Sequence, residues 1–107
     1  MPAYAVAYLD ELKVNREIVR YLNRIDETLE PYDGHFLVHG KKGEVVEGAS
    51  PGLCIIIEFP DLNHAHNWYY SDAYQEILPF RTKNCEGSVI LIDGVPPDYR
   101  ASDLLRN

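Results

Sequence analysis

Arg81, Tyr74 and His39 are the side chains in this sequence whose types and spacing suggest chemistry. Tyr74, Ile77, Leu78 and Arg81 recur at i, i+3, i+4 and i+7, so they share one face of a helix. A guanidinium on an apolar face needs a carboxylate, backbone carbonyls or a ligand anion. His39 interrupts an otherwise apolar strand, and an imidazole titrates in the range that suits proton transfer. We predict these three as catalytic residues.

Structural roles for the same residues stay open at this point. Arg81 could form a buried salt bridge to Glu58 or Asp93, or cap the carbonyls at a helix end. His39 could be a hydrogen-bonded histidine of a sheet. Aromatic side chains are in general more often core than ligand cage.

The segment 68–81, WYYSDAYQEILPFR, concentrates large rings ahead of Arg81. Apolar walls with one or two convergent polar groups are the usual form of a small-ligand site. We therefore expect this segment to wall a cavity in which Arg81 anchors a ligand. The residues predicted to contact the substrate are Phe36, Trp68, Tyr70 and Ser71.

The four histidines do not predict a metal site. His35 and His39, four apart, are expected on the same side of one strand, about 13 Å from each other. His64 and His66 point in different directions on a helix, and no spacing matches a zinc pattern. No glycine-rich phosphate loop precedes a helix. We predict no metal and no cofactor.

Composition narrows the class of protein. The chain has 107 residues, which favours one domain, and a formal net charge of −7, which argues against binding nucleic acid or anionic membranes. No apolar run approaches the roughly 20 residues that span a bilayer, and the N-terminal segment lacks the pattern of a signal peptide. Cys54 and Cys85 do not make a disulfide framework, and we expect both to be catalytically inert. A cytoplasmic protein is expected.

The elements that must position these residues follow a β-α-β-β-α-β order. Strands are predicted at 3–9, 35–39, 53–59 and 88–92, with helices beginning after Asn15 and Asp61 and the second helix restarting at Ser71 or Asp72. The apolar face of the first helix is predicted as Ile18, Val19, Leu22, Ile25 and Leu29. This order predicts an α+β, ferredoxin-like fold, an antiparallel sheet with its helices on one face.

Two of the strands predict a partner. Residues 53–57 and 89–92 are apolar throughout, whereas the strands of a sheet with one solvent-exposed face would alternate apolar and polar residues. Because two helices cover only one face, we expect a second copy of the chain to cover the other, in a two-fold homodimer. The alternative is that the tail, residues 96–107, folds back over the open face.

The segments GHFLVHG, VVEG, CIIIEFPDLNHAHNWYYSDAYQEILPFR and SVILIDG resemble the domain-of-unknown-function 1330 family over roughly residues 3 to 95. The family pattern corresponds here to Gly34, Phe36, Gly48, Glu58, Phe59, Trp68, Ser71, Tyr74 and Arg81. His39 departs from the arginine expected in this strand. The resemblance implies a dimeric α/β barrel of ferredoxin-like subunits, here a domain at 1–95 and a tail at 96–107, with a pocket between sheet and helices.

The family has no established general activity, but its superfamily includes cofactor-independent monooxygenases, muconolactone isomerases, haem-handling enzymes and stress-responsive proteins. Three functions therefore stay open. The first is a small cofactor-independent enzyme acting on an organic acid or aromatic compound. The second is a non-catalytic metabolite-binding or stress-response protein. The third is a structural dimer module in which Arg81 belongs to an internal ion pair.

Overall fold

The computed structural model describes residues 1–106 and has the predicted β-α-β-β-α-β order. Its strands are β1 (Ala3–Leu9), β2 (His35–Lys42), β3 (Leu53–Phe59) and β4 (Gly87–Asp93). Its helices are α1 (Arg16–Leu29), α2 (Leu62–Tyr69) and α3 (Asp72–Thr82), with short 3₁₀ turns η1 (Glu30–Tyr32) and η2 (Ala101–Arg106).

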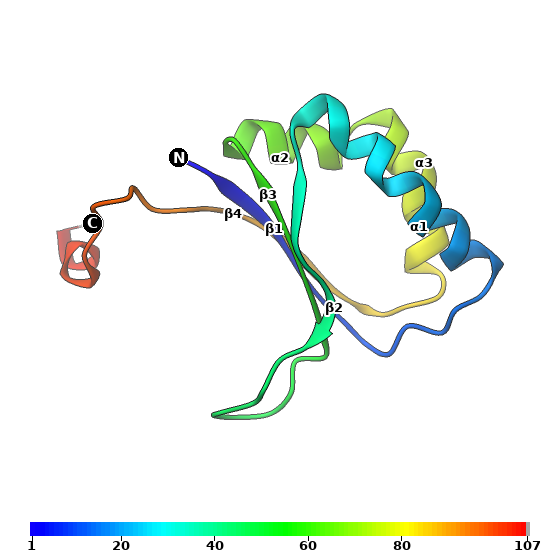
Figure 1. Ribbon diagram of the computed structural model, residues 1–107, viewed down its shortest axis with the longest axis horizontal. Helices are drawn as coiled ribbons and strands as arrows, with labels where there is room; N and C mark the ends of the chain where they lie inside the picture. Colours follow the sequence, from blue (N-terminus) through cyan, green and yellow to red (C-terminus); the bar gives the residue numbers. More distant parts are fainter. Residues whose placement is uncertain (107) are drawn as a thin grey trace.

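The sheet is antiparallel throughout, in the order β2-β3-β1-β4. All three α-helices lie on one face of it (Figure 1). The ferredoxin-like α+β fold predicted from the sequence is confirmed.

The helices begin at the predicted caps. The Asn15 side chain accepts a hydrogen bond from the Ile18 N–H at 3.0 Å, and the Asp61 carboxylate accepts one from the His64 N–H at 2.8 Å. Ser71 Oγ accepts from the Tyr74 N–H at 3.2 Å. Such caps each contribute about 1 kcal/mol. The cap at Ser71 divides the second helical segment into α2 and α3, which fixes where Tyr74 and Arg81 fall.

The buried face of α1 differs from the predicted one. Its buried residues are Ile18, Tyr21, Ile25, Thr28 and Leu29. Val19 and Leu22 are 44% and 37% exposed, so assigning them to the buried face was wrong. The aliphatic residues were counted and Tyr21 was not, although Tyr21 stands three residues after Ile18 and four before Ile25.

Small side chains lie at the centre of the sheet, under the helices. Along β1 the residues that face the helices are Ala3, Ala5, Ala7 and Leu9, and all four are buried. Because an alanine fills little of the space between the layers, the middle of this interface does not close completely. The largest fully buried side chains are Trp68, Phe59, Ile18 and Ile77.

The strand β2 contains two register shifts that decide which way its side chains face. Phe36 pairs with Ile57 and His39 pairs with Ile55, with irregularities between Phe36 and Val38 and between His39 and Lys41. His35 instead pairs with Glu58, on the opposite face of the sheet. The expectation that His35 and His39 face the same side was therefore wrong, because a bulge between them breaks the alternation.

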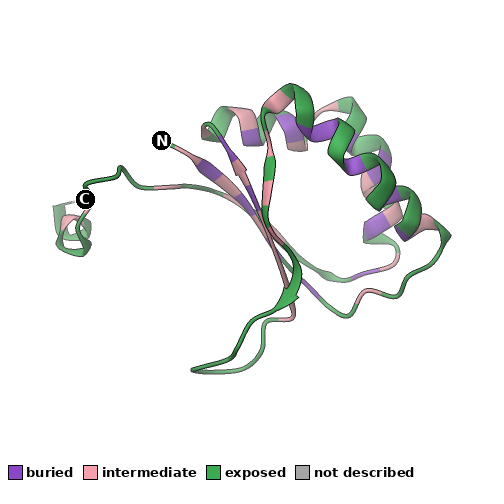
Figure 2. Ribbon diagram, in the orientation of Figure 1, coloured by how far each residue is buried: buried purple, intermediate pink, exposed green. Residues whose placement is uncertain are grey.

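The outer face of the sheet carries exposed apolar side chains, and no helix of residues 1–106 covers it (Figure 1). Ile90 and Ile92 of β4 are 51% and 48% exposed, and Tyr8 and Leu37 are exposed as well. After Asp93 the chain leads away from the sheet, and η2 lies apart from the body with its residues largely exposed (Figure 2). The tail as far as residue 106 thus does not fold back over this face.

Candidate functional site

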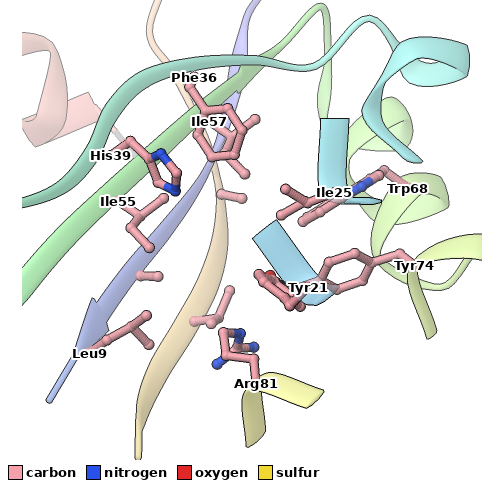
Figure 3. A pocket seen from close by; sticks show the side chains of 13 residues that line it. Leu9, Tyr21, Ile25, Phe36, His39, Ile55, Ile57, Trp68, Tyr74 and Arg81 are labelled. Atoms are coloured by element: carbon pink, nitrogen blue, oxygen red, sulfur yellow. Dashed lines mark hydrogen bonds between the residues drawn. The ribbon is translucent and has the colours of Figure 1, made fainter. Parts of the chain in front are cut away.

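A cavity with a volume of about 30 Å³ lies between the sheet and the helices, above the alanines of β1. Its walls are mostly apolar, and the polar groups come from α1, α3 and β2 (Figure 3). The lining residues are Ala5, Ala7, Leu9, Tyr21, Ile25, Phe36, His39, Ile55, Ile57, Trp68, Tyr74, Arg81 and Val89. A single water molecule needs on the order of 10–15 Å³, so this space accommodates small groups.

Arg81 is buried in this wall, with 7% of its surface exposed. Within residues 1–106 no carboxylate lies within 4.0 Å of its guanidinium, so neither Glu58 nor Asp93 pairs with it. At the end of α3 the Phe80 carbonyl accepts a hydrogen bond from the Asn84 side chain. A cation held in an apolar wall without a counter-ion from this part of the chain is suited to receive an anion from outside.

The aromatic neighbours of Arg81 supply part of its stabilisation. Its guanidinium carbon lies 5.8 Å from the centre of the Tyr21 ring, within the range of a cation–π contact. Burial works to lower the pKa of Arg81, but the Tyr74 and Tyr21 hydroxyls favour the charged form, and the net pKa lies above the usual value. Arg81 is therefore a permanent positive charge in the cavity.

Tyr21 and Tyr74 form a pair of hydroxyls beside this charge. Their oxygens are 2.7 Å apart and their rings meet edge to face, with centroids 6.1 Å apart. Burial raises the pKa of both phenols, so both are neutral near pH 7. Their mutual hydrogen bond uses one of the two protons, which leaves the other available for a ligand oxygen.

Trp68 packs against the ring of Tyr74 and fixes its position. The indole Nε1 donates to Thr28 Oγ1 at 3.0 Å, and that hydroxyl donates to the Ile25 carbonyl at 2.7 Å. The Trp68 ring lies 4.2 Å from the Tyr74 ring, centroid to centroid. Because the indole N–H and the Thr28 hydroxyl both have hydrogen-bond partners, the indole has a fixed orientation and forms a rigid wall.

His39 lies on the sheet side of the cavity, opposite the tyrosine pair (Figure 3). Its ring stacks on Phe36, with centroids 4.4 Å apart and planes 30° from parallel. His39 is exposed to solvent and also lines the cavity.

Five of the seven residues predicted from the sequence meet at this cavity: His39, Tyr74, Arg81, Phe36 and Trp68. The structure places the other two elsewhere. Tyr70 is 62% exposed and its ring lies against His66. Ser71 caps α3 and donates to the Trp68 carbonyl at 2.7 Å. Tyr21 was not predicted, although its place on the helical stripe with Ile18 and Ile25 was readable.

Residues 1–106 contain no cluster of three or more histidine, cysteine, aspartate or glutamate side chains arranged to hold a metal ion. In the same part of the chain, none of the helices combines the length and apolar character needed to cross a membrane.

The fold and cavity together define a ferredoxin-like α+β protein with a small, mostly apolar pocket between its layers. The chain belongs to the family described as Domain of unknown function (DUF1330), whose sequence pattern matches residues 2–95. The resemblance found in the sequence is thereby confirmed. No curated protein sequence gives a significant match.

Solved structures share the fold at low sequence identity. The RPA0582 protein of unknown function from Rhodopseudomonas palustris is 14% identical, with a TM-score of 0.64, over 90% of this chain and 84% of that one. A hydroxynitrile lyase from Passiflora edulis is 13% identical, with a TM-score of 0.59, over 92% of this chain and 97% of that one. At3g17210 from Arabidopsis thaliana is 19% identical, with a TM-score of 0.56, over 92% of this chain and 98% of that one. Identities this low show a common fold and no more.

Proposed function

We propose that this protein is a cofactor-independent enzyme that binds a small organic acid between its sheet and helices and moves a proton on it, as an isomerase does. The observation that carries the proposal is Arg81, a buried cation with no carboxylate partner in residues 1–106, beside the neutral hydroxyls of Tyr21 and Tyr74. Donors of this kind stabilise a developing oxyanion when they converge on it between apolar walls.

The proposed step is enolisation. The His39 imidazole takes a proton from the carbon next to a carbonyl, and the C–H electron pair becomes a carbon–carbon double bond. The carbonyl electrons move onto oxygen, where Arg81 and a hydroxyl of the tyrosine pair stabilise the negative charge. In a substrate with a carbon–carbon double bond next to the enolised carbon, the enolate is conjugated with it. His39 then returns the proton to the far carbon of that double bond, the carbonyl re-forms and the double bond shifts by one position, which completes an isomerisation. In a substrate without such a double bond the proton returns to the same carbon, and the step is seen as proton exchange. Phe36 and Trp68 hold the apolar part of the substrate.

A protein that shares this fold is a hydroxynitrile lyase, which supports the proposal that a protein of this fold can be an enzyme. The second candidate function is binding of the same acid without turnover, which needs Arg81 and the tyrosines but not His39. The third candidate, a structural module in which Arg81 belongs to an internal ion pair, is not supported, because within residues 1–106 no carboxylate lies within 4.0 Å of Arg81.

Ligand binding and proton transfer are tested separately with 2-oxobutanoate, a four-carbon acid that enolises. At 100 times its dissociation constant it should stabilise the protein by about 2.7 kcal/mol, a rise in Tm of roughly 10 °C. Arg81→Gln should abolish the rise. Arg24→Gln is the matched control, because Arg24 is an exposed helix arginine 3.7 Å from Glu76 and outside the cavity.

Proton transfer is measured as exchange of the carbon-bound protons at C3 of 2-oxobutanoate in heavy water. The wild type should accelerate exchange, whereas His39→Asn should still bind and fail to accelerate it. Binding without accelerated exchange would establish the non-catalytic function instead. No Tm rise with this acid or with other small carboxylic acids and phenols would refute the site.

We also propose that the chain is a homodimer in which the outer faces of two sheets pack together. The exposed apolar side chains of this face, Tyr8, Leu37, Ile90 and Ile92, support it. So does the course of the tail, which as far as residue 106 leaves that face uncovered.

A further inference from the structure

A second apolar space adjoins the candidate site. Its volume is about 50 Å³, and it shares Leu9, Tyr21, His39, Ile55 and Arg81 with the first cavity. Because the two spaces share five wall residues, we treat them as two lobes of one cleft. The groups with chemistry, Arg81, Tyr21 and His39, all belong to the shared wall.

The two lobes differ in what lines them beyond this shared wall. In the first lobe Phe36, Trp68 and Tyr74 present aromatic surfaces. In the second, Leu12, Ile18, Leu22 and Leu53 present aliphatic ones. Neither lobe contains a charged side chain outside the shared wall, so the charge-bearing part of a ligand is best accommodated where the lobes meet.

We infer that the ligand is an acid branched next to its charged group, with the oxyanion at Arg81 and one short apolar arm in each lobe. This inference rests on the proposed function, because it assumes that Arg81 holds the anion. An acid with its carboxylate at the end of one chain fills only one lobe. The lobe volumes of about 30 and 50 Å³ are well below the 150 Å³ or so of an apolar cavity that binds benzene, so the arms are short.

The test compares two isomeric acids, 2-ethylbutanoate and hexanoate, which have the same atoms and charge. Only the first is branched at the carbon that bears the carboxylate. Each additional two-carbon arm buried by the branched acid should strengthen binding about tenfold. We expect 2-ethylbutanoate to bind the wild type about tenfold more tightly than hexanoate, as measured by calorimetry.

A second experiment reduces the volume of the aliphatic lobe by a substitution at one of its lining residues. Leu22→Phe adds bulk at a lining residue, and Val19→Phe adds the same ring on the same helix at a residue that lines neither lobe. In Leu22→Phe the ratio of the affinities for 2-ethylbutanoate and hexanoate should fall close to one. In Val19→Phe the same ratio should stay near ten. The Tm of each unliganded variant shows that it is folded.

Equal affinities of the wild type for the two isomers, with Arg81-dependent binding of both, would overturn this inference and leave the proposed function standing. Loss of the preference in Val19→Phe as well as in Leu22→Phe would also overturn it. Binding of neither isomer, with no Tm rise from 2-oxobutanoate, would refute both.

Discussion

Arg81 and the two tyrosines beside it are an unusual set of polar groups for the interior of a small protein. The positive charge depends on aromatic rings and hydroxyls rather than on a carboxylate from residues 1–106. This arrangement leaves the cavity electropositive while its walls stay apolar. A ligand anion would gain Coulombic attraction in a medium less polar than water, where each such interaction is stronger.

The raised pKa values of Tyr21 and Tyr74 predict how the stability of the protein changes at alkaline pH. Burial raises the pKa of Tyr21 and of Tyr74 above the ordinary 10.0. The unfolded chain therefore ionises these phenols first, so their contribution to stability is complete below about pH 10 and is lost as the pH rises above it. Tyr21→Phe removes one of these groups, and its stability should fall less steeply with pH.

The measurement is urea unfolding of wild type and Tyr21→Phe between about pH 8 and pH 11. Near pH 11 the slopes of unfolding free energy against pH should differ between the two proteins by the equivalent of nearly one proton per molecule. Tyr70→Phe, which removes the hydroxyl of a side chain that is 62% exposed, is the control and should keep the wild-type slope. Identical slopes in all three proteins would contradict burial of the Tyr21 hydroxyl.

Sequence reasoning identified the residues of this site unevenly. Arg81 and Tyr74 were predicted because helical spacing joins them on one stripe. Helical spacing from Ile18 and Ile25 could have placed Tyr21 on the buried face of α1, but no local pattern reports its contact with Tyr74, which is 53 residues away. Tyr70 and Ser71 were included because they adjoin Trp68 in sequence, but neighbours along a helix point in different directions.

At the scale of the elements, β2 decides whether His39 belongs to the site. Gly40 follows His39 with a φ of +73°, at the second register shift of the strand. This left-handed conformation strongly favours glycine. The bulge between Phe36 and Val38 and this turn of the backbone together place His39 at the rim of the cavity.

Gly40→Ala should therefore destabilise the protein by about 1–2 kcal/mol. A side chain at Gly40 would meet nothing within 4 Å, so the cost comes from the backbone alone. Gly43→Ala is the matched control, since Gly43 has the same open surroundings without a positive φ, and its stability should stay within about 0.5 kcal/mol of the wild type. Urea unfolding gives both values, and equal stabilities of the two variants would contradict the role of Gly40.

The elements themselves were predictable where local chemistry fixes them. The caps Asn15, Asp61 and Ser71 mark helix starts because each side chain accepts a nearby N–H. The bulges in β2 were not predicted, because strict alternation of side chains was assumed between His35 and His39. Register depends on the pairing of β2 with β3, which no short window of sequence contains.

At the scale of the whole molecule, the outer sheet face makes the homodimer testable. Ile90→Glu places a charge on this face at a side chain that is 51% exposed within the subunit, so the fold itself should tolerate it. We expect light scattering to give about twice the 12.3 kDa chain mass for the wild type and the monomer mass for Ile90→Glu. Leu105→Glu, in the exposed tail, should remain dimeric. A wild-type mass of 12.3 kDa at every concentration would contradict the proposed interface.

The alanines of β1 have one more consequence. The cavity exists because Ala5 and Ala7 stand where larger side chains would close the space between the layers, while the backbone of β1 pairs with β3 and β4 regardless of side-chain size. Pocket volume and fold are thus encoded separately in the same strand. Substitution of Ala5 or Ala7 in a descendant of this chain would be enough to change which molecule the cavity admits. The strand order and the backbone pairing of the sheet would stay the same.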